Sequence, residues 1–160
     1  MAALEQLNAT DVRLVITRFR DALRAHQEAL NRLNVYPVPD GDTGTNMTLT
    51  VESVVQELGS AEAMSEVCQA IAHGSLMGAR GNSGVILSQI LRGVADTFRG
   101  RDTAGPAEIS AALRTASDAA YHAVMRPVEG PILTVVRWSA AAAEDAHGKG
   151  TPAVVSVPAE

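Results

Sequence analysis

The sequence predicts an all-α protein built as an antiparallel bundle or barrel of helices. Six segments carry apolar residues three or four positions apart, the spacing that places them on one face of a helix. Apolar residues form 46% of the 160-residue chain but aromatic residues only 3%, so the core must consist mainly of small aliphatic side chains, which suit closely packed helices. The chain has the length of a single domain, and no segment alternates as a convincing strand does.

The first predicted helix ends at a loop that contains two prolines. Thr10 is the expected N-cap, and the helix then extends for about six turns. Pro37 and Pro39 cannot lie inside a helix that follows, so residues 34–42 are expected to form an ordered loop. The apolar positions of this first helix are Val12, Ile16, Phe19, Leu23, Leu30 and Leu33.

Three further helices are separated by glycine-containing connections. The second is expected to begin near residues 43–45 and to end at the Gly-Ser pair of 59–60, and the third is expected to span about 61–77. The stretch GARGNSG (78–84) then precedes the fourth helix. The apolar positions are Met47, Val51, Val54, Val55 and Leu58, then Met64, Val67, Cys68 and Ile71, then Val85, Ile86, Ile90, Val94 and Phe98.

The last two helices follow a polar turn and a proline-containing break. Residues 99–105 are expected to be a solvated connection to the fifth helix. The stretch RPVEGP (126–131) separates that helix from a sixth over about 132–146, in which Trp138 is expected to pack in the core or at the rim. Residues 147–160 show no helical period and are expected to form an irregular tail.

Three of the five connections are expected to meet at one end of the bundle. Alternate connections of an antiparallel bundle fall at the same end, and residues 34–46, 78–84 and 126–131 form the first, third and fifth. Each is rich in glycine, proline or small polar residues and leads into a helix N-terminus. This end, called the rim below, is therefore the candidate functional site.

The first rim connection places two aspartates, Asp40 and Asp42, one glycine apart. Like charges this close repel unless a cation shares them, and hydroxyl and amide side chains follow at Thr43, Thr45 and Asn46. Mg²⁺ prefers oxygen ligands of this kind, and the N–H groups of a helix N-terminus suit phosphate. The plainer alternative is that Asp-Gly-Asp only forms a turn.

The glycine-rich stretch 78–84 offers phosphate donors again, with Arg80 as a fixed positive charge. Alone, it also fits an ordinary helix–helix connector, but two such loops at one end favour a nucleotide-phosphate site. The Walker A pattern is absent, because it needs a lysine and Lys149 is the only one. An EF-hand would need glycine and glutamate where Thr45 and Val51 stand, and an aspartyl-phosphate enzyme would need a buried strand before its aspartates.

Charge and cysteine content exclude several other classes. The formal net charge of −5 argues against non-specific nucleic-acid binding. Cys68 is the only cysteine, which excludes an internal disulfide and a cysteine-rich zinc site, and its apolar surroundings indicate a small buried hydrophobe. Neither a signal peptide nor an apolar run of membrane-spanning length is found, so a soluble cytoplasmic protein without membrane insertion is expected.

Three motifs lie in order along the chain: LNVYPVPDGDTGTNM (33–47), HGSLMGARGNSGVILSQILRG (73–93) and AVMRPVEGPILTVVR (123–137). They closely resemble the DhaL-type kinase domain, the nucleotide-binding domain of dihydroxyacetone kinases. The closer likeness is to the N-terminal domain of the bacterial fatty acid kinase catalytic subunit. The resemblance covers residues 5–146 and implies an ATP-binding kinase domain over that range.

The resemblance implies an antiparallel eight-helix barrel that binds ATP at one rim through two Mg²⁺ ions. Asp40 and Asp42 match the metal-binding, catalytic aspartates, and Asn34 stands where dihydroxyacetone kinases have a third acidic ligand. The remaining matches are Thr43, Gly44, Thr45 and Asn46 in the first phosphate segment, Arg80, Gly81, Asn82 and Ser83 in the second, and Gly130 and Ile132 beside the base and ribose.

The chain departs from the family pattern at two places. Fatty acid kinases usually read VEGTILTV where this chain reads VEGPILTV (128–135), so Pro131 removes a hydroxyl and an N–H. The family's domain also continues through a DAGGQG-like loop and closing helices that have no counterpart before Glu160. About six of the eight helices are therefore expected, in a chain that is a fragment or ends in a diverged tail.

The resemblance implies an ATP-dependent phosphotransferase, most closely of the fatty acid kinase type, whose acceptor is carried by an acyl-binding partner protein. Glycerone (dihydroxyacetone) kinase, with a dihydroxyacetone-binding partner, is the alternative within the same class. The alternative of another class is a nucleotide-binding or regulatory module without turnover. No residue stands out as a general base.

Overall fold

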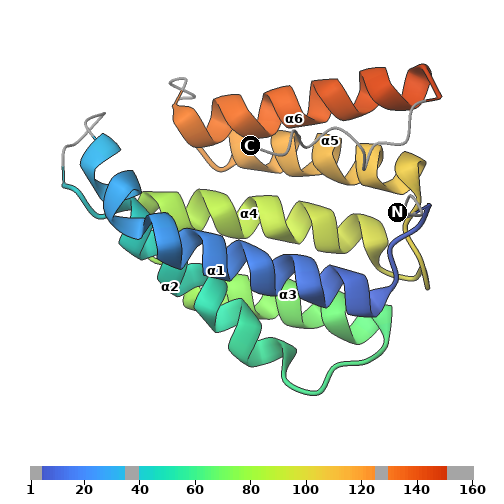
Figure 1. Ribbon diagram of the computed structural model, residues 1–160, viewed down its shortest axis with the longest axis horizontal. Coiled ribbons are helices and arrows are strands. Elements are labelled where there is room, and N and C mark those ends of the chain that lie inside the picture. Colours follow the sequence, from blue (N-terminus) through green and yellow to red (C-terminus); the bar gives the residue numbers. More distant parts are fainter. Residues whose placement is uncertain (1–4, 35–39, 125–129, 151–160) are drawn as a thin grey trace.

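The computed structural model, which describes residues 5–34, 40–124 and 130–150, confirms the all-α fold. The helices are antiparallel in chain order (Figure 1). No strand forms among the described residues, and none of their helices is long and apolar enough to cross a membrane. The helices are α1 (Ala9–Leu33), α2 (Thr43–Leu58), α3 (Met64–Gly78), α4 (Gly81–Phe98), α5 (Pro106–His122) and α6 (Pro131–Gly148).

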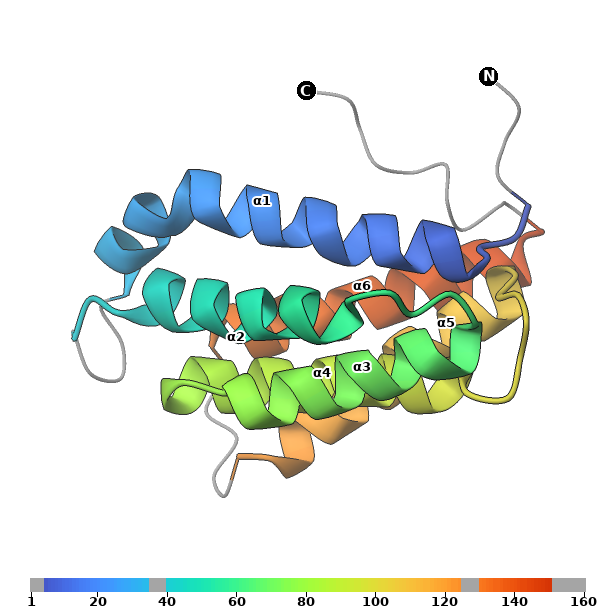
Figure 2. The ribbon, with the colours of Figure 1, turned by 90° about the horizontal axis from the view of Figure 1, so that it is seen from below.

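Neighbouring helices pack in chain order and leave the arrangement open. Helix α1 packs on α2, α2 on α3 and α4, α3 on α4, α4 on α5, and α5 on α6. Within the described residues α1 makes no contact with α5 or α6, so the two edges of the arrangement do not meet (Figures 1 and 2).

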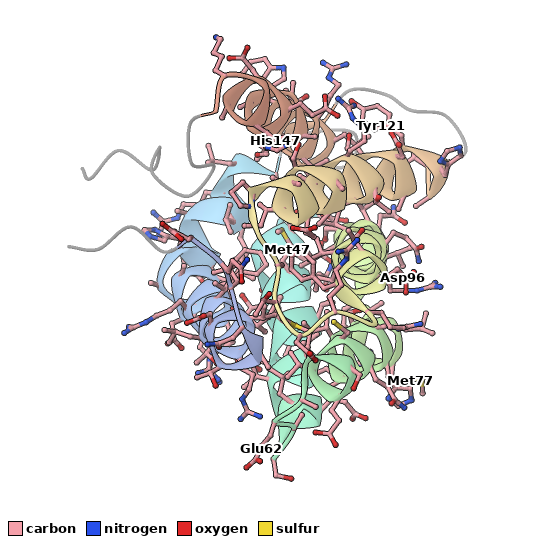
Figure 3. All side chains as sticks on the ribbon, turned by 90° about the vertical axis from the view of Figure 1, so that its right-hand side faces the viewer. Met47, Glu62, Met77, Asp96, Tyr121 and His147 are labelled. Atoms are coloured by element: carbon pink, nitrogen blue, oxygen red, sulfur yellow. The ribbon has the colours of Figure 1, made fainter. Side chains whose placement is uncertain are left out.

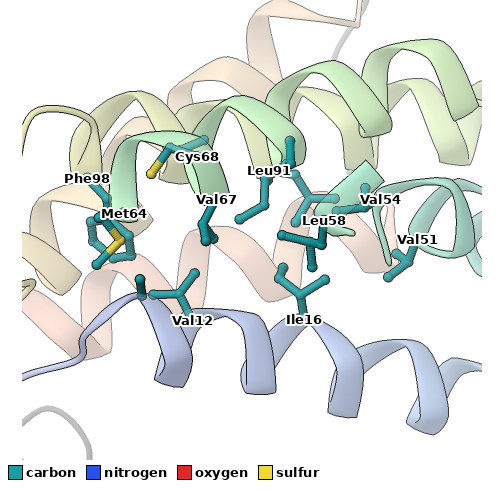
Figure 4. Close-up of a cluster of buried hydrophobic side chains, with 14 of the residues drawn as sticks. Val12, Ile16, Val51, Val54, Leu58, Met64, Val67, Cys68, Leu91 and Phe98 are labelled. Carbon is teal, nitrogen blue, oxygen red and sulfur yellow. The ribbon is translucent and has the colours of Figure 1, made fainter. Parts of the chain in front are cut away.

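Helix α4 lies between two hydrophobic clusters. Leu87, Leu91 and Phe98 belong to the larger cluster, which α4 shares mainly with α1, α2 and α3 (Figure 4) and to which α5 adds Ala112. Ile86 and Ile90 pack instead against the smaller cluster, which α5 and α6 supply. Viewed along the helices, Met47 lies toward the interior, whereas Glu62 and Met77 lie at the surface (Figure 3). Other members of the larger cluster are Val12, Ile16, Val51, Val54, Leu58, Met64, Val67 and Cys68.

Helix α1 begins before the predicted cap at Thr10, because Asn8 caps it. The Asn8 side chain accepts the Asp11 N–H at 3.0 Å, and the Asn8 N–H donates to the Asp11 carboxylate at 2.9 Å. This reciprocal pair is a capping box, which satisfies two backbone donors at once. Helix α4 likewise begins earlier than predicted, at Gly81 inside the glycine-rich stretch.

Helix α3 begins at Met64, later than predicted, because Glu66 reaches back to the preceding backbone. Its carboxylate accepts the N–H of Glu62 at 3.0 Å and of Ala63 at 3.2 Å. These two bonds, the one from Glu62 foremost, lower the pKa of the Glu66 carboxyl, because they favour its charged form. Residues 61–63 therefore precede the helix, with two of their N–H groups bonded to Glu66, and do not form its first turn.

Two expectations about exposure are wrong. Residues 99–105 are more than a solvated connection, because Ala104 is fully buried and exchanges two backbone hydrogen bonds of 2.8 Å with Leu7. This bridge joins the segment before α1 to the connection between α4 and α5, at the end of the molecule opposite the rim (Figure 2). For Trp138, expected in the core or at the rim, the core is the part that is wrong, because 67% of the residue is exposed on α6.

Cys68 is expected to be unreactive in the folded protein. It is fully buried, and that burial raises the pKa of its thiol, so the nucleophilic thiolate is scarce near neutral pH. We expect Ellman's reagent to label Cys68 slowly in native protein and at once in denaturant. Rapid labelling of the native protein at pH 8 would show that α3 is not packed as described.

Candidate functional site

The connections between α1 and α2, α3 and α4, and α5 and α6 lie at the same end of the helices, as predicted (Figures 1 and 2). Two of them are described only in part. Residues 35–39, with Pro37 and Pro39, and residues 125–129 lie outside the described residues.

The end of the first connection brings the predicted metal residues together. Asp40 and Asp42 are exposed, and Gly41 between them has a φ of 67°, a left-handed conformation that glycine adopts readily. The Asn34 amide donates a short hydrogen bond to the Asp40 carboxylate. Asp42 is the N-cap residue of α2, but its side chain makes no cap hydrogen bond, so its carboxylate remains available to a ligand.

Two carboxylates and an amide oxygen form a donor set that fits Mg²⁺, which takes hard oxygen ligands. Asp40, Asp42 and Asn34 supply these atoms. The part of the chain that the structure describes contains no group of three or more His, Cys, Asp or Glu residues suited to a metal. Such a site would therefore depend on further oxygens from a ligand or water, as Mg²⁺ sites beside phosphates commonly do.

The first turn of α2 presents backbone donors beside these carboxylates. The N–H of Asn46 is bonded to the Asp42 carbonyl at 2.8 Å, and the N–H of Thr45 to the Asn31 side chain at 3.1 Å. The N–H groups of Thr43 and Gly44 have no acceptor among the described residues. With the positive end of the helix dipole, they suit an anion.

The N-terminus of α4 lies against the same turn of α2. A Cβ at Gly81 would lie 2.4 Å from the Asn46 side-chain nitrogen, and the N–H of Arg80 donates to the Thr50 hydroxyl at 3.3 Å. The Arg80 side chain is exposed at this point. The backbone N–H groups here that lack an acceptor among the described residues are those of Gly81, Asn82 and Ser83.

The glycines of the 78–84 stretch allow this close approach. A Cβ at Gly78 would lie 2.2 Å from the Ser53 Cβ, and one at Gly84 would lie 2.6 Å from the Thr50 hydroxyl. Thr50 is fully buried and also donates to the Asn46 carbonyl at 2.7 Å. The glycine content of this stretch is therefore explained first by helix packing, which places the two helix N-termini side by side.

Gly130 and Ile132 lie at the start of α6 and at the same end of the molecule. The Gly130 carbonyl accepts the N–H of Thr134 at 2.9 Å, and Pro131 occupies a position that suits proline at a helix start. Within the described residues α6 contacts α5 and α4 but neither α1 nor α2. The structure therefore brings the first two predicted segments into contact, whereas α6, which begins at the third segment, contacts neither helix that flanks the aspartate loop.

Sequence reasoning missed two site residues on α1, Gln27 and Asn31. Their side-chain nitrogens donate to the Thr45 hydroxyl at 3.3 and 3.1 Å. The only signal in the sequence is a pair of amides four residues apart, which would lie on one face of a helix just before the aspartate loop.

Two open surface hollows of the described residues lie at the opposite end, around residues 57–62. Arg13 lines one of them, and its guanidinium donates to the carbonyls of Gly59 at 2.9 Å, Leu58 at 3.4 Å and Ala61. It thereby caps the C-terminal end of α2, where carbonyls lack helical partners. We place the functional site at the rim and not in these hollows.

The fold and the rim together define an all-helical domain in which an acidic loop adjoins two helix N-termini. The chain belongs to the DAK2 domain family, whose model matches residues 37–157. This domain is associated with ATP-binding phosphotransferases of the dihydroxyacetone kinase type. The match begins after α1, although α1 shares the larger hydrophobic cluster with α2, α3 and α4. The boundaries 5–146 for the kinase domain and 147–160 for the tail stay predictions.

The chain is also similar to part of several longer bacterial proteins. It is 48% identical to Protein YloV of Bacillus subtilis over 120 residues, which are 74% of this chain and 22% of that protein. It is 46% identical over 123 residues to an uncharacterized protein of Staphylococcus saprophyticus and 45% identical over 123 residues to one of Staphylococcus haemolyticus. Each of these two matches covers 76% of this chain, which thus spans only 22% of the length of either relative.

Proposed function

We propose that this chain is a phosphotransferase domain that binds Mg-ATP at the rim. The observation that carries the proposal is the position of two exposed aspartates, Asp40 and Asp42, beside the adjoining N-termini of α2 and α4. Helix N-termini with free N–H groups favour phosphate, and carboxylates favour the cation that accompanies it. Membership of the DAK2 family supports a nucleotide as the phosphate-bearing ligand.

Each group of the rim then has a distinct task. Asp40 and Asp42, with Asn34, would hold Mg²⁺, which when bound neutralises charge on the transferred phosphate. Arg80 adds a fixed positive charge. The phosphates would be held by the N–H or side-chain donors of Thr43, Gly44, Thr45, Asn46, Gly81, Asn82 and Ser83, and the base and ribose would lie at Gly130 and Ile132.

The acceptor is proposed to be a fatty acid presented by an acyl-binding partner protein. The support is the likeness of the 33–47, 73–93 and 123–137 motifs to fatty acid kinases. No described rim residue is placed as a general base, which suits a reaction that depends mainly on positioning and charge neutralisation. Glycerone kinase, with a dihydroxyacetone-binding partner, is the second candidate, and the family association with dihydroxyacetone kinases favours it.

A binding or regulatory module without turnover is the third candidate. The observation that favours it is the open arrangement, in which α1 and α6 make no contact among the described residues. Phosphate transfer to a fatty acid in the presence of its carrier protein, or to dihydroxyacetone with its binding subunit, would identify the acceptor. Nucleotide binding without transfer to either would favour the regulatory module.

Calorimetric titration of the 160-residue chain with a non-hydrolysable ATP analogue tests the nucleotide site itself. We expect saturable binding in the presence of Mg²⁺ and its loss when the metal is chelated, because the carboxylates would otherwise repel the phosphates. Equal affinity with and without the divalent cation would contradict a metal-bridged site, and absence of binding under both conditions would contradict the proposed function.

A further inference from the structure

Two amide side chains of α1 hold Thr45 from one side. The Asn31 Oδ1 accepts the N–H of Thr45 at 3.1 Å, and the Asn31 Nδ2 donates to its hydroxyl oxygen at 3.1 Å. The Gln27 Nε2 donates to the same oxygen at 3.3 Å. A backbone N–H can only donate, so it fixes the orientation of the Asn31 amide and forces the nitrogen to face the hydroxyl.

The hydroxyl of Thr45 is consequently used differently from those of its neighbours in α2. Thr48 and Thr50 donate at 2.7 Å to carbonyls four residues earlier in the same helix. The Thr45 oxygen instead accepts two hydrogen bonds, which occupy both of its lone pairs. Its proton is therefore directed away from α1, at a partly exposed position in the first turn of α2.

The same turn of α1 also supports the acidic side of the rim. The N–H of Asn34 donates to the Asn31 carbonyl at 3.3 Å, and the Asn34 amide donates to Asp40. Gly44 lets α2 approach α1 closely enough for the two bonds between Asn31 and Thr45, since a Cβ at Gly44 would lie 3.0 Å from the Asn31 Oδ1. Asn31 thus connects Thr45 and Asp40 through one short piece of helix.

We propose that Asn31 is a positioning residue that contacts no ligand but directs the Thr45 hydroxyl to donate toward the phosphates of the bound nucleotide. Gln27 supports the same orientation as a second donor. The inference rests on the proposed function, because it requires a phosphate at the rim. A hydrogen bond to a charged oxygen is stronger than a neutral one, so the direction of a single hydroxyl has a measurable effect on affinity.

A double-variant cycle tests this role, with the affinity of the 160-residue chain for a non-hydrolysable ATP analogue and Mg²⁺ as the readout. Asn31→Asp keeps the shape of the side chain and the acceptor for the Thr45 N–H, but its carboxylate can only accept, so the hydroxyl proton turns toward α1. We expect Asn31→Asp to weaken binding about tenfold in the otherwise unchanged chain, and less than about twofold in the Thr45→Val background.

The second background separates hydroxyl orientation from simple charge repulsion. Repulsion between the introduced carboxylate and the phosphates acts in both backgrounds, so an equal loss of affinity in the two would overturn the role of Asn31. An affinity of Asn31→Asp equal to that of the unchanged chain would overturn it as well. Thr48→Val is the matched control, because the Thr48 hydroxyl is bonded within α2, and its affinity should equal that of the unchanged chain. A loss in that control as large as in Thr45→Val would also count against the proposal.

Circular dichroism and Tm establish that each variant is folded. Where Asn31→Asp does not fold, Gln27→Glu reverses the polarity of the second amide, and the same cycle with Thr45→Val then decides. Failure of the unchanged chain to bind the analogue would contradict both the proposed function and the proposed role of Asn31. Binding by the unchanged chain, with Asn31→Asp losing the same affinity in both backgrounds, would contradict only the role of Asn31.

Discussion

The double variant Asp40→Asn with Asp42→Asn is expected to lose Mg²⁺-dependent nucleotide binding and to keep the fold. Both side chains are exposed and lie outside the core, and Asp42, although it is the N-cap residue of α2, makes no side-chain cap bond. An asparagine at position 40 can still accept the hydrogen bond from Asn34, so the replacements should leave the helices folded. The two charges repel each other in the metal-free protein, so Tm should stay the same or rise slightly. Without the two carboxylates Mg²⁺ loses its hard oxygen ligands, and the metal can no longer bridge the protein to the phosphates.

Calorimetry with the ATP analogue and Mg²⁺ measures the loss, and circular dichroism measures the fold. The matched control is Asp21→Asn with Asp96→Asn, which removes two exposed aspartates from α1 and α4 away from the rim. Their ion pairs with neighbouring arginines lie at the surface and contribute little to stability. The control should bind as the unchanged chain does, so a rim variant that binds equally well would contradict the metal assignment.

Periodicity predicts the six helices because each of them buries one apolar face, and the glycines and prolines predict where the chain turns. The exact starts are less predictable, because caps decide them. Asn8 and Thr10 are both acceptable N-cap residues in the sequence, and only the reciprocal bonds with Asp11 select Asn8. Glu66 similarly holds residues 62 and 63 out of α3 through backbone bonds that no periodic pattern reports.

Features that depend on which helices meet could not be read from one sequence. Trp138 is expected in the core or at the rim because large aromatic side chains usually pack, but among the described residues α6 contacts only α5 and α4, and Trp138 is exposed. Gln27 and Asn31 are ordinary polar positions of an amphipathic helix until the first turn of α2 packs beside them. The aspartates were identifiable because their chemistry is local, whereas the residues that orient Thr45 lie on another helix.

Gly44→Ala is expected to destabilise the protein through the contact between α1 and α2. Gly44 is buried, and a Cβ there would lie 2.3 Å from the Gln27 carbonyl oxygen and 2.9 Å from the Leu30 Cβ. Neither atom belongs to the flexible end of a side chain, so α2 must move away from α1. We expect the free energy of unfolding to fall by about 1–3 kcal/mol, the usual cost of overpacking, even though alanine is the better helix former by about 1 kcal/mol.

Urea unfolding measures this loss, with Gly148→Ala as the matched control. Gly148 ends α6, and a Cβ there would meet no atom within 4 Å, so this variant should be as stable as the unchanged chain or slightly more so. The shift that relieves Gly44→Ala also draws Thr45 away from Asn31, so nucleotide affinity should fall together with stability. A Gly44→Ala protein that unfolds at the same urea concentration as the control would show that α1 and α2 are not in this close contact, and the orientation of Thr45 by α1 would then lose its structural basis.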